Sequence, residues 1–187
     1  ADISINLSDE QMTVDGYGVF AAMPKLYQQA GDIFWVDRPD TYELDRLIHD
    51  LGASAIRFEV PPTVYPVEGE GYDWTGSVFG TGGMTETFRL MREYIDRGCN
   101  RFIASVWTPP CWMKESGECN GPFEGALSSG NMDNFLKVEY YDDFANFLAD
   151  FAQAVLDSVG VELYAVSPQN EPYFHEPYNS CVYSSDG

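Results

Sequence analysis

Basic residues and long apolar runs are both scarce in this sequence. Ten Lys and Arg residues stand against thirty Asp and Glu residues, which gives a formal net charge of −20 at pH 7, and only three of the ten are lysines. Nucleic acids and anionic membrane surfaces are bound mainly through Lys and Arg, so this balance argues against both as partners. No apolar run approaches the roughly 18 residues that a membrane span needs, and we expect no transmembrane segment.

Histidine and cysteine are also few. The four cysteines are Cys99, Cys111, Cys119 and Cys181, and the two histidines are His49 and His175. No CxxC pair is present and the histidines lie far apart, so the spacing matches no zinc site, and we expect neither a metal nor another cofactor. Cys111 and Cys119 flank a loop of Gly, Pro and polar residues, and a short disulfide or a pair of small buried thiols fits this pattern equally well.

The remaining composition is that of a folded, acidic domain. The chain has 187 residues, of which 44% are hydrophobic and 15% aromatic, and this is enough for one domain with a sizeable core. The negative charge favours a neutral or multivalent partner. Such an excess of carboxylate suits a saline or extracellular setting, and we expect a secreted protein.

Short apolar runs alternate with stretches of helical period. The runs predict strands at Val14–Phe20, Ser54–Val60, Arg101–Trp107 and Val161–Ser167. Three helices are predicted between them, the first starting near Asp40 or Thr41, with apolar faces made by Leu44, Leu47, Ile48 and Leu51, by Phe88, Met91 and Ile95, and by Phe144, Phe147, Leu148, Phe151, Val155 and Leu156. Their expected ends are Gly52, Gly98 and Gly160, because glycine accepts a left-handed cap. The alternation predicts parallel strands joined by right-handed crossovers.

The long loops follow the strands rather than the helices. Residues 61–83 and 108–139 are rich in Pro and Gly, and in a (β/α)8 TIM barrel such loops gather at the C-terminal strand ends, where the active site lies. A complete barrel needs about 250 residues, whereas four strands are predicted here. The sequence therefore predicts an α/β fold, either a smaller open sheet or the first half of a TIM barrel that spans residues 1–187.

The strongest functional signal is AVSPQNEP, residues 165–172, at the end of the fourth predicted strand. Asn170 and Glu171 place an amide beside a carboxyl group where the strand turns into a loop, and Pro172 fixes that turn. A glycosidase needs such a pair, because the acid protonates the leaving oxygen while the amide holds the sugar 2-hydroxyl. The alternative interpretation is a polar strand end followed by a turn.

Other candidates lie at the ends of the second and third predicted strands. Arg57 interrupts the apolar run SAIRFEV, where an unpaired guanidinium is costly to bury. It is predicted either to form an ion pair with Glu59 or to orient a catalytic carboxylate. The segment SVWTPPCWMK contains Trp107 and Trp112, whose rings suit a platform for the apolar face of a sugar. For Trp112, packing against the core is the alternative.

The segment after Glu171, YFHEPYNSCVY, is rich in aromatic residues. Tyr173 is a candidate for lining a substrate cleft, whereas Phe174 and Tyr178 fit packing within the loop as well. His175 has no second His or Cys at ligand spacing, so we interpret it as a polar loop residue.

Together these segments resemble glycoside hydrolase family 30. The resemblance rests on ASVWTPPCWMK, YYDDFANFLADFAQAV, YAVSPQNEP and PYNSCVYS, and on the opening VDGYG. It implies a retaining β-glycosidase on a TIM barrel. It further implies Glu171 as general acid/base, Asn170 as the 2-hydroxyl contact, Arg57 as the residue that steadies the nucleophile and Trp107 as a wall of the cleft. The stretches GYGVF and RFEVPP depart from the pattern of the family.

The resemblance also implies a nucleophile on a seventh strand. Retaining chemistry needs two carboxyl groups about 5–5.5 Å apart, and Glu59, Glu115 and Glu176 lie in separate segments without a supporting motif. We therefore expect the nucleophile to lie outside this chain, on a C-terminal half barrel from the same or another chain, and this chain alone to be inactive.

The expected substrate is a β-linked polysaccharide, with xylan or glucuronoxylan first. A glucosylceramidase-like or β-1,6-glucanase activity, and a half barrel that binds carbohydrate without cleaving it, are the alternatives.

Overall fold

The computed structural model describes residue 8 and residues 14–20, 28–29, 32–33, 44–75, 83–121 and 133–183. One sheet contains β1 (Tyr17–Phe20), β4 (Ala53–Val60), β5 (Arg101–Val106) and β6 (Ala165–Ser167), in that spatial order. All of its pairings are parallel. Because spatial order equals chain order, each crossover joins neighbouring strands, and the predicted parallel α/β arrangement is confirmed. A separate antiparallel pair consists of β2 (Gln28–Gln29) and β3 (Asp32–Ile33).

The register of the sheet brings particular residues side by side. Arg57 of β4 lies opposite Phe20 of β1 and Ile103 of β5. Two residues further along, Ser105 lies between Glu59 on one side and Ser167 on the other. Since parallel strands end at the same edge of a sheet, the loops after β4, β5 and β6 emerge together.

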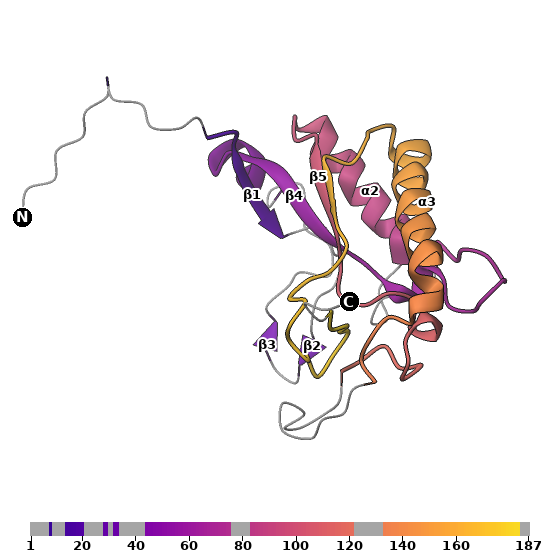
Figure 1. Cartoon of the computed structure of the whole chain (residues 1–187). Coiled ribbons are helices and arrows are strands. Elements are labelled where there is room, and N and C mark those ends of the chain that lie inside the picture. The colour runs from indigo at the N-terminus through magenta and orange to yellow at the C-terminus, as the bar shows by residue number, and fades with distance from the viewer. Residues whose placement is uncertain are drawn as a thin grey trace, which may run out of the picture.

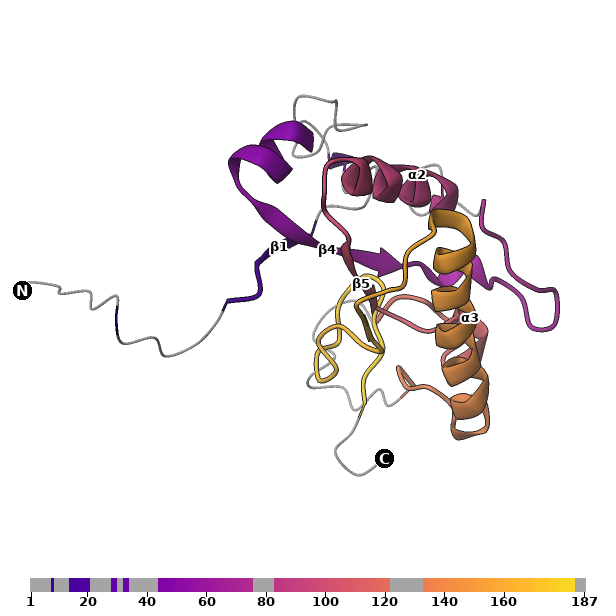
Figure 2. The ribbon, with the colours of Figure 1, turned by 90° about the horizontal axis from the view of Figure 1, so that it is seen from above.

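Two long helices pack beside this sheet. They are α2 (Gly83–Asp96) and α3 (Tyr141–Val159), which lie next to each other on one side of the strands (Figure 1). The view from above shows the same placement (Figure 2). Shorter helical turns are η1 (Arg46–Asp50), η2 (Pro62–Val64), η3 (Cys111–Met113) and η4 (Val138–Tyr140).

The α3 helix shows why the core forms where it does. Four of the six residues of the predicted stripe are buried, and Leu148 and Leu156 are half-buried. The four are Phe144, Phe147, Phe151 and Val155. Phe151 contacts Phe58 of β4, with 6.1 Å between ring centroids, so this face joins helix to sheet. Gly160 ends the helix with φ of 82° and donates its N–H to the Leu156 carbonyl, as predicted for a left-handed cap.

Several predicted limits differ from the structure, and two are off by one residue: β4 begins at Ala53 instead of Ser54, and β5 ends at Val106 instead of Trp107. The first strand begins at Tyr17 rather than Val14, whose side chain is 61% exposed. The fourth begins at Ala165 rather than Val161, because it pairs with β5 over only three residues. Leu51 lies beyond the end of η1 and is exposed instead of buried. The predicted start of that helix near Asp40 lies outside the described residues.

Among the residues that the structure describes, no helix combines the length and the apolar character needed to cross a membrane.

Candidate active site

Arg57 joins three strands of the sheet at one point. Its Nη2 donates a hydrogen bond to Asn170 Oδ1 at 2.7 Å, directly after β6, and another to Ser105 Oγ at 2.7 Å, on β5. Hydrogen bonds from a charged donor are among the stronger ones in proteins. Arg57 and Asn170, two separately predicted site residues, are therefore in direct contact, although 113 residues separate them in the sequence.

Aromatic rings surround the same guanidinium. The Arg57 Cζ lies 4.7 Å from the ring centroid of Trp107 and 5.8 Å from that of Phe20. The two rings also contact each other, with 5.4 Å between centroids. A cation held between ring faces is favoured by the ring quadrupoles. Trp107 is thus part of the Arg57 cluster, as expected for a residue that lines the site.

Glu171 follows Asn170 in an unusual backbone conformation. The Asn170 N–H donates to the Val106 carbonyl at 2.6 Å, which extends the contact between β5 and β6 to the site. Glu171 has φ of 45°, the one described non-glycine residue with a positive value. Its carbonyl accepts from the Phe174 N–H at 2.9 Å and closes a tight turn. The side chain is left exposed to solvent.

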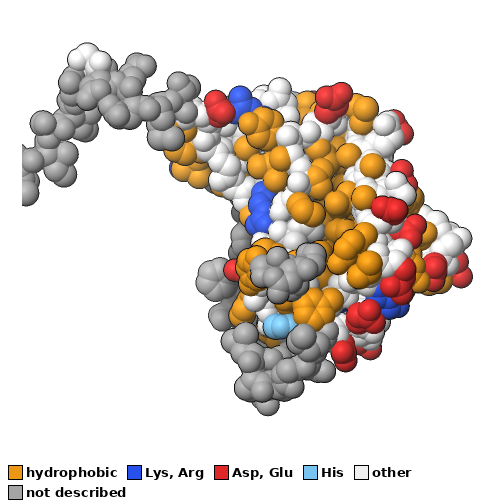
Figure 3. Space-filling model, viewed as in Figure 1, with side chains coloured by type: hydrophobic (Ala, Val, Ile, Leu, Met, Phe, Trp, Pro, Cys, Tyr) orange, Lys and Arg blue, Asp and Glu red, His pale blue; other side chains and the backbone are white. Residues whose placement is uncertain are grey.

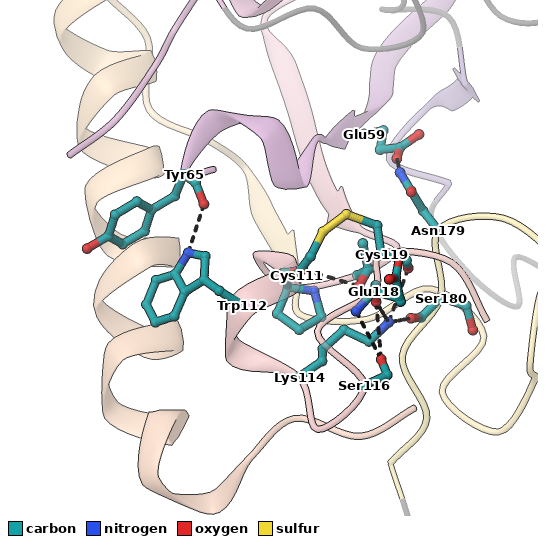
Figure 4. The surroundings of a disulfide bond; sticks show 12 residues. Glu59, Tyr65, Cys111, Trp112, Lys114, Ser116, Glu118, Cys119, Asn179 and Ser180 are labelled. Carbon is teal, nitrogen blue, oxygen red and sulfur yellow. Dashed lines mark hydrogen bonds between the residues drawn. A yellow bond between two sulfur atoms is a disulfide. The ribbon is translucent and has the colours of Figure 1, made fainter. Parts of the chain in front are cut away.

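The negative charge of Glu171 affects the pKa of Arg57. Burial lowers the pKa of Arg57 from its usual value, while the negative charges of Glu171 and then Glu59 act in the opposite direction. The Glu59 carboxyl itself accepts a hydrogen bond from Asn179 Nδ2 at 3.1 Å (Figure 4). Both carboxylates thus act on Arg57 through their charge, and the two interpretations of Arg57, an ion pair with Glu59 and the orientation of a catalytic carboxylate, stay predictions.

Two buried carboxyl groups lie near Glu171. Glu59 is 6% exposed, and burial raises its pKa to about 7. Glu176 is 1% exposed, and its Oε1 accepts from Asn170 Nδ2 at 3.3 Å. Burial first, and then the neighbouring Glu171, raises the pKa of Glu176 to about 8. Near neutral pH, Glu176 therefore favours the protonated form, whereas Glu59 is about half protonated.

The two remaining predicted contacts differ in their surroundings. Tyr173 is 70% exposed, two residues after Glu171. Trp112 packs edge-on against Tyr65 and Tyr140, with centroid distances of 5.1 and 5.0 Å. Its Nε1 donates to the Tyr65 carbonyl at 3.0 Å (Figure 4). This packing agrees with the alternative in which Trp112 fills the loop against the core, and a sugar contact by Trp112 stays a prediction.

The loop after β5 is tied to the segment after β6. A disulfide joins Cys111 and Cys119, which decides between the two patterns that the sequence allowed. Lys114 is buried inside this loop, and its Nζ donates to the carbonyls of Glu118, Cys119 and Ser180 (Figure 4). Burial lowers the pKa of Lys114 to about 8. The other two cysteines, Cys99 and Cys181, are buried thiols.

Within the described ranges, no group of three or more His, Cys, Asp and Glu side chains is arranged to hold a metal ion. His175 lies in the loop after Glu171, where its Nδ1 is 3.4 Å from Asn134 Nδ2.

The surface is divided by residue type. Hydrophobic side chains run down the middle of the face seen in Figure 3, while Asp and Glu gather toward the edge occupied by α3. Exposed aromatic residues near β6 are Tyr164, just before the strand, and Tyr173, Phe174 and Tyr178 after it. Rings at an exposed surface suit contact with the apolar faces of sugars.

Comparison with known proteins identifies the chain. The family model described as the glycosyl hydrolase family 30 TIM-barrel domain matches residues 87–180, just over half of the sequence. The chain belongs to glycosyl hydrolase family 30. The match runs from α2 through the candidate acid, so Trp107, Asn170 and Glu171 all lie within the family 30 region.

Relatives and solved structures agree with this family. Glucuronoxylanase XynC from Bacillus subtilis (strain 168) is 30% identical over 118 residues, covering 54% of this chain and 26% of XynC. The structure of a family 30 subfamily 8 xylanase, Xyn30A from Clostridium acetobutylicum, has a TM-score of 0.66 at 22% identity over 97% of this chain and 38% of that one. The endo-β-1,6-glucanase BT3312 has a TM-score of 0.60 at 21% identity, over 97% and 40%. This family 30 chain thus matches about a quarter of its curated relative.

Several residues of the site had no assigned role in the sequence analysis. Ser105 accepts a hydrogen bond from Arg57. Gln169 Nε2 donates to the carbonyls of Trp107 and Asn170 at 2.7 and 2.8 Å, and so connects the ends of β5 and β6. Glu59 was considered as a nucleophile and as an ion-pair partner of Arg57, and Glu176 only as a nucleophile. No sequence signal marks their buried contacts, because their partners are distant in the chain or lie in an irregular loop.

Proposed function

We propose that this chain supplies the acid/base side of a retaining β-glycosidase. The observation that carries this proposal is the Arg57–Asn170 hydrogen bond at the C-terminal end of the parallel sheet, with Trp107 stacked on Arg57 and Glu171 next in the chain. In a barrel fold this edge of the sheet holds the active site. The exposed Glu171 carboxyl is then within reach of a glycan.

In this proposal each residue has a distinct role. Glu171 gives a proton to the leaving glycosidic oxygen and later accepts one from water. Arg57 fixes the amide of Asn170 by holding its oxygen. An amide nitrogen carries two hydrogens, so the bond from Asn170 to Glu176 leaves a second donor for the sugar 2-hydroxyl. Trp107 and Tyr173 supply aromatic surface for the sugar rings.

We place the nucleophile in a part of the barrel that this chain does not contain. Among the described residues, Glu59 and Glu176 are the buried carboxyl groups near Glu171, and burial raises their pKa values to about 7 and about 8, so a large share of each is protonated near neutral pH. A protonated carboxyl is a poor nucleophile. The sequential order of the four parallel strands supports residues 1–187 as the N-terminal half of a barrel, completed by a C-terminal half.

The substrate we propose is a β-linked polysaccharide, with glucuronoxylan first. The relative that supports this choice is the glucuronoxylanase XynC, at 30% identity. Secretion is supported by the Cys111–Cys119 disulfide, because such bonds persist in oxidising compartments.

The decisive experiment compares leaving groups in the enzyme that contains this chain together with its nucleophile. Glu171→Ala should abolish hydrolysis of glucuronoxylan but lower kcat/KM for an aryl β-xyloside with an activated leaving group far less, because that leaving group needs no proton and kcat/KM does not include the later, base-assisted step. Glu162→Ala, at an exposed position before β6, is the control. Equal losses on both substrates would refute the acid role, and cleavage of β-1,6-glucan but not xylan would refute the substrate.

A second experiment uses the chain alone. Incubated with aryl β-xylosides, residues 1–187 should show no turnover. Turnover that is lost in Glu171→Gln would place a nucleophile within these residues and overturn our assignment.

A further inference from the structure

Glu176 occupies a fixed place beside the candidate acid, yet the chemistry proposed above gives it no task. Its side chain is 1% exposed, and Oε1 accepts a hydrogen bond from Asn170 Nδ2 at 3.3 Å. The opposite end of the same amide, Oδ1, is held by Arg57 at 2.7 Å. The Asn170 amide is therefore hydrogen-bonded at both ends: its oxygen binds the Arg57 guanidinium, and its nitrogen binds the Glu176 carboxyl group.

The position of Glu176 is determined by the backbone around it. Its own N–H donates to Ser180 Oγ at 3.1 Å, and the same hydroxyl accepts from Asn134 Nδ2 at 2.9 Å. Gly121, in the loop after β5, lies directly against it. A Cβ at Gly121 would come within 2.2 Å of the Glu176 carbonyl oxygen, so no larger residue fits there. Two loops thus enclose the carboxyl group.

The charges around Glu176 favour a bound proton. Burial is the main cause of its raised pKa, and the Glu171 carboxyl adds to it through a hydrogen bond and through its charge. Glu59, on β4, adds a smaller repulsion, and only Tyr178 among the contributing groups acts the other way. The cations facing this segment bind other groups: Arg57 holds Asn170 Oδ1, and Lys114 holds the Ser180 carbonyl.

We propose that Glu176 is a positioning residue of the active site, which as a neutral carboxylic acid accepts from the Asn170 amide and fixes the orientation of that amide. Its Oε1 holds the amide nitrogen, which contacts the sugar, while Arg57 holds the amide oxygen. This inference rests on the function proposed above. Ionised Glu176 would repel an ionised Glu171, so the arrangement is weakened once the proton is lost.

The test follows the protonation of Glu176 directly. We would label the Glu side-chain carboxyl carbons of residues 1–187 with ¹³C, record their chemical shifts against pH, and assign Glu176 by the signal lost in Glu176→Gln. Its midpoint should lie near pH 8. Glu171→Gln should lower that midpoint by at least about half a pH unit, because it removes a like charge. Glu162→Gln, at an exposed site, should leave it unchanged.

Kinetics of the enzyme that contains this chain and its nucleophile separate positioning from mere stability. Glu176→Ala should lower kcat between about tenfold and 100-fold with little change in KM, because it would displace the Asn170 amide, whose hydrogen bond to the sugar 2-hydroxyl strengthens in the transition state. Glu176→Gln, which keeps an acceptor and a donor, should restore most of kcat and alter the alkaline side of the pH profile.

The two proposals fail differently. A Glu176 midpoint in the ordinary range near about 4.3, or one that Glu171→Gln leaves unchanged, overturns the role of Glu176. So does a Glu176→Ala enzyme that matches Glu162→Ala in kcat. Full activity of Glu171→Ala on xylan overturns the acid role instead, whatever the titration shows.

Discussion

Arg57 donates a 2.7 Å hydrogen bond to Asn170. This bond connects β4 to the segment that follows β6, on the far side of β5. The contact places the amide that precedes the candidate acid under the control of a residue on another strand. Substitution of Arg57 should therefore change the position of Glu171 through Asn170, without a direct bond between Arg57 and Glu171.

Replacing Arg57 by Lys should weaken both the fold and the site. Lysine keeps the charge but cannot lie flat against Trp107 while donating to Ser105 and Asn170. We expect a loss of about 1–3 kcal/mol in the free energy of unfolding of residues 1–187, measured with urea. Arg101→Lys, at the other end of β5, is the control, and equal stabilities of the two variants would contradict the prediction.

Glu59 should make stability depend on pH. Its pKa rises from 4.5 to about 7 on folding, so the folded state binds more protons than the unfolded state in that interval. The free energy of unfolding contributed by Glu59 therefore falls as pH rises from 4.5 to about 7. Glu59→Gln removes this contribution, and the variant should gain stability relative to the native chain between pH 5 and about pH 7.5.

The comparison is made by urea unfolding at both pH values, with Glu162→Gln as the exposed control. A stability difference between Glu59→Gln and the native chain that is the same at both pH values would show that Glu59 is ionised throughout.

Loss of the Cys111–Cys119 disulfide should destabilise the chain. The two cysteines are separated by 8 positions, and closing a loop of that size in the unfolded chain corresponds to about 2–3 kcal/mol. Urea unfolding of the Cys111→Ser, Cys119→Ser double variant should show this loss. A reductant should lower the stability of the native chain but not of the double variant, and a reductant effect of equal size on both would point to another cause.

Lys114 should matter more than an ordinary lysine. Lys114→Met removes the donor from three carbonyl groups, and each unsatisfied buried group costs about 1–3 kcal/mol. We expect a loss of at least about 3 kcal/mol in thermal or urea unfolding. Lys137→Met is the matched control, because Lys137 binds one carbonyl, that of Trp112. Similar losses in both variants would refute the special role of Lys114.

Much of the fold could be predicted because it depends on local pattern. The α3 stripe recurs at helical spacing, and Gly160 marks its end in the sequence itself. The errors fall where pairing rather than pattern decides: Val161 is apolar, yet β6 has only three residues of β5 to pair with.

The site residues likewise fall into those that a sequence pattern predicts and those that only tertiary packing brings together. Glu171 and Asn170 stand in a recognisable motif, and Arg57 is conspicuous as a charge inside an apolar run. The contacts of Ser105 and Glu176 depend on strand register and on loop packing, which no short segment of sequence encodes. The roles proposed for Glu171, Asn170 and Arg57 are tested by the experiments above.

Because the backbone of Glu171 is left-handed, stability and catalysis favour different residues at position 171. A side chain in this region costs roughly 1–2 kcal/mol that glycine would not incur. A laboratory selection for heat resistance alone should therefore drift toward glycine at position 171 and yield tougher, inert proteins. Any effort to stabilise the enzyme that contains this chain must therefore screen for turnover at every round.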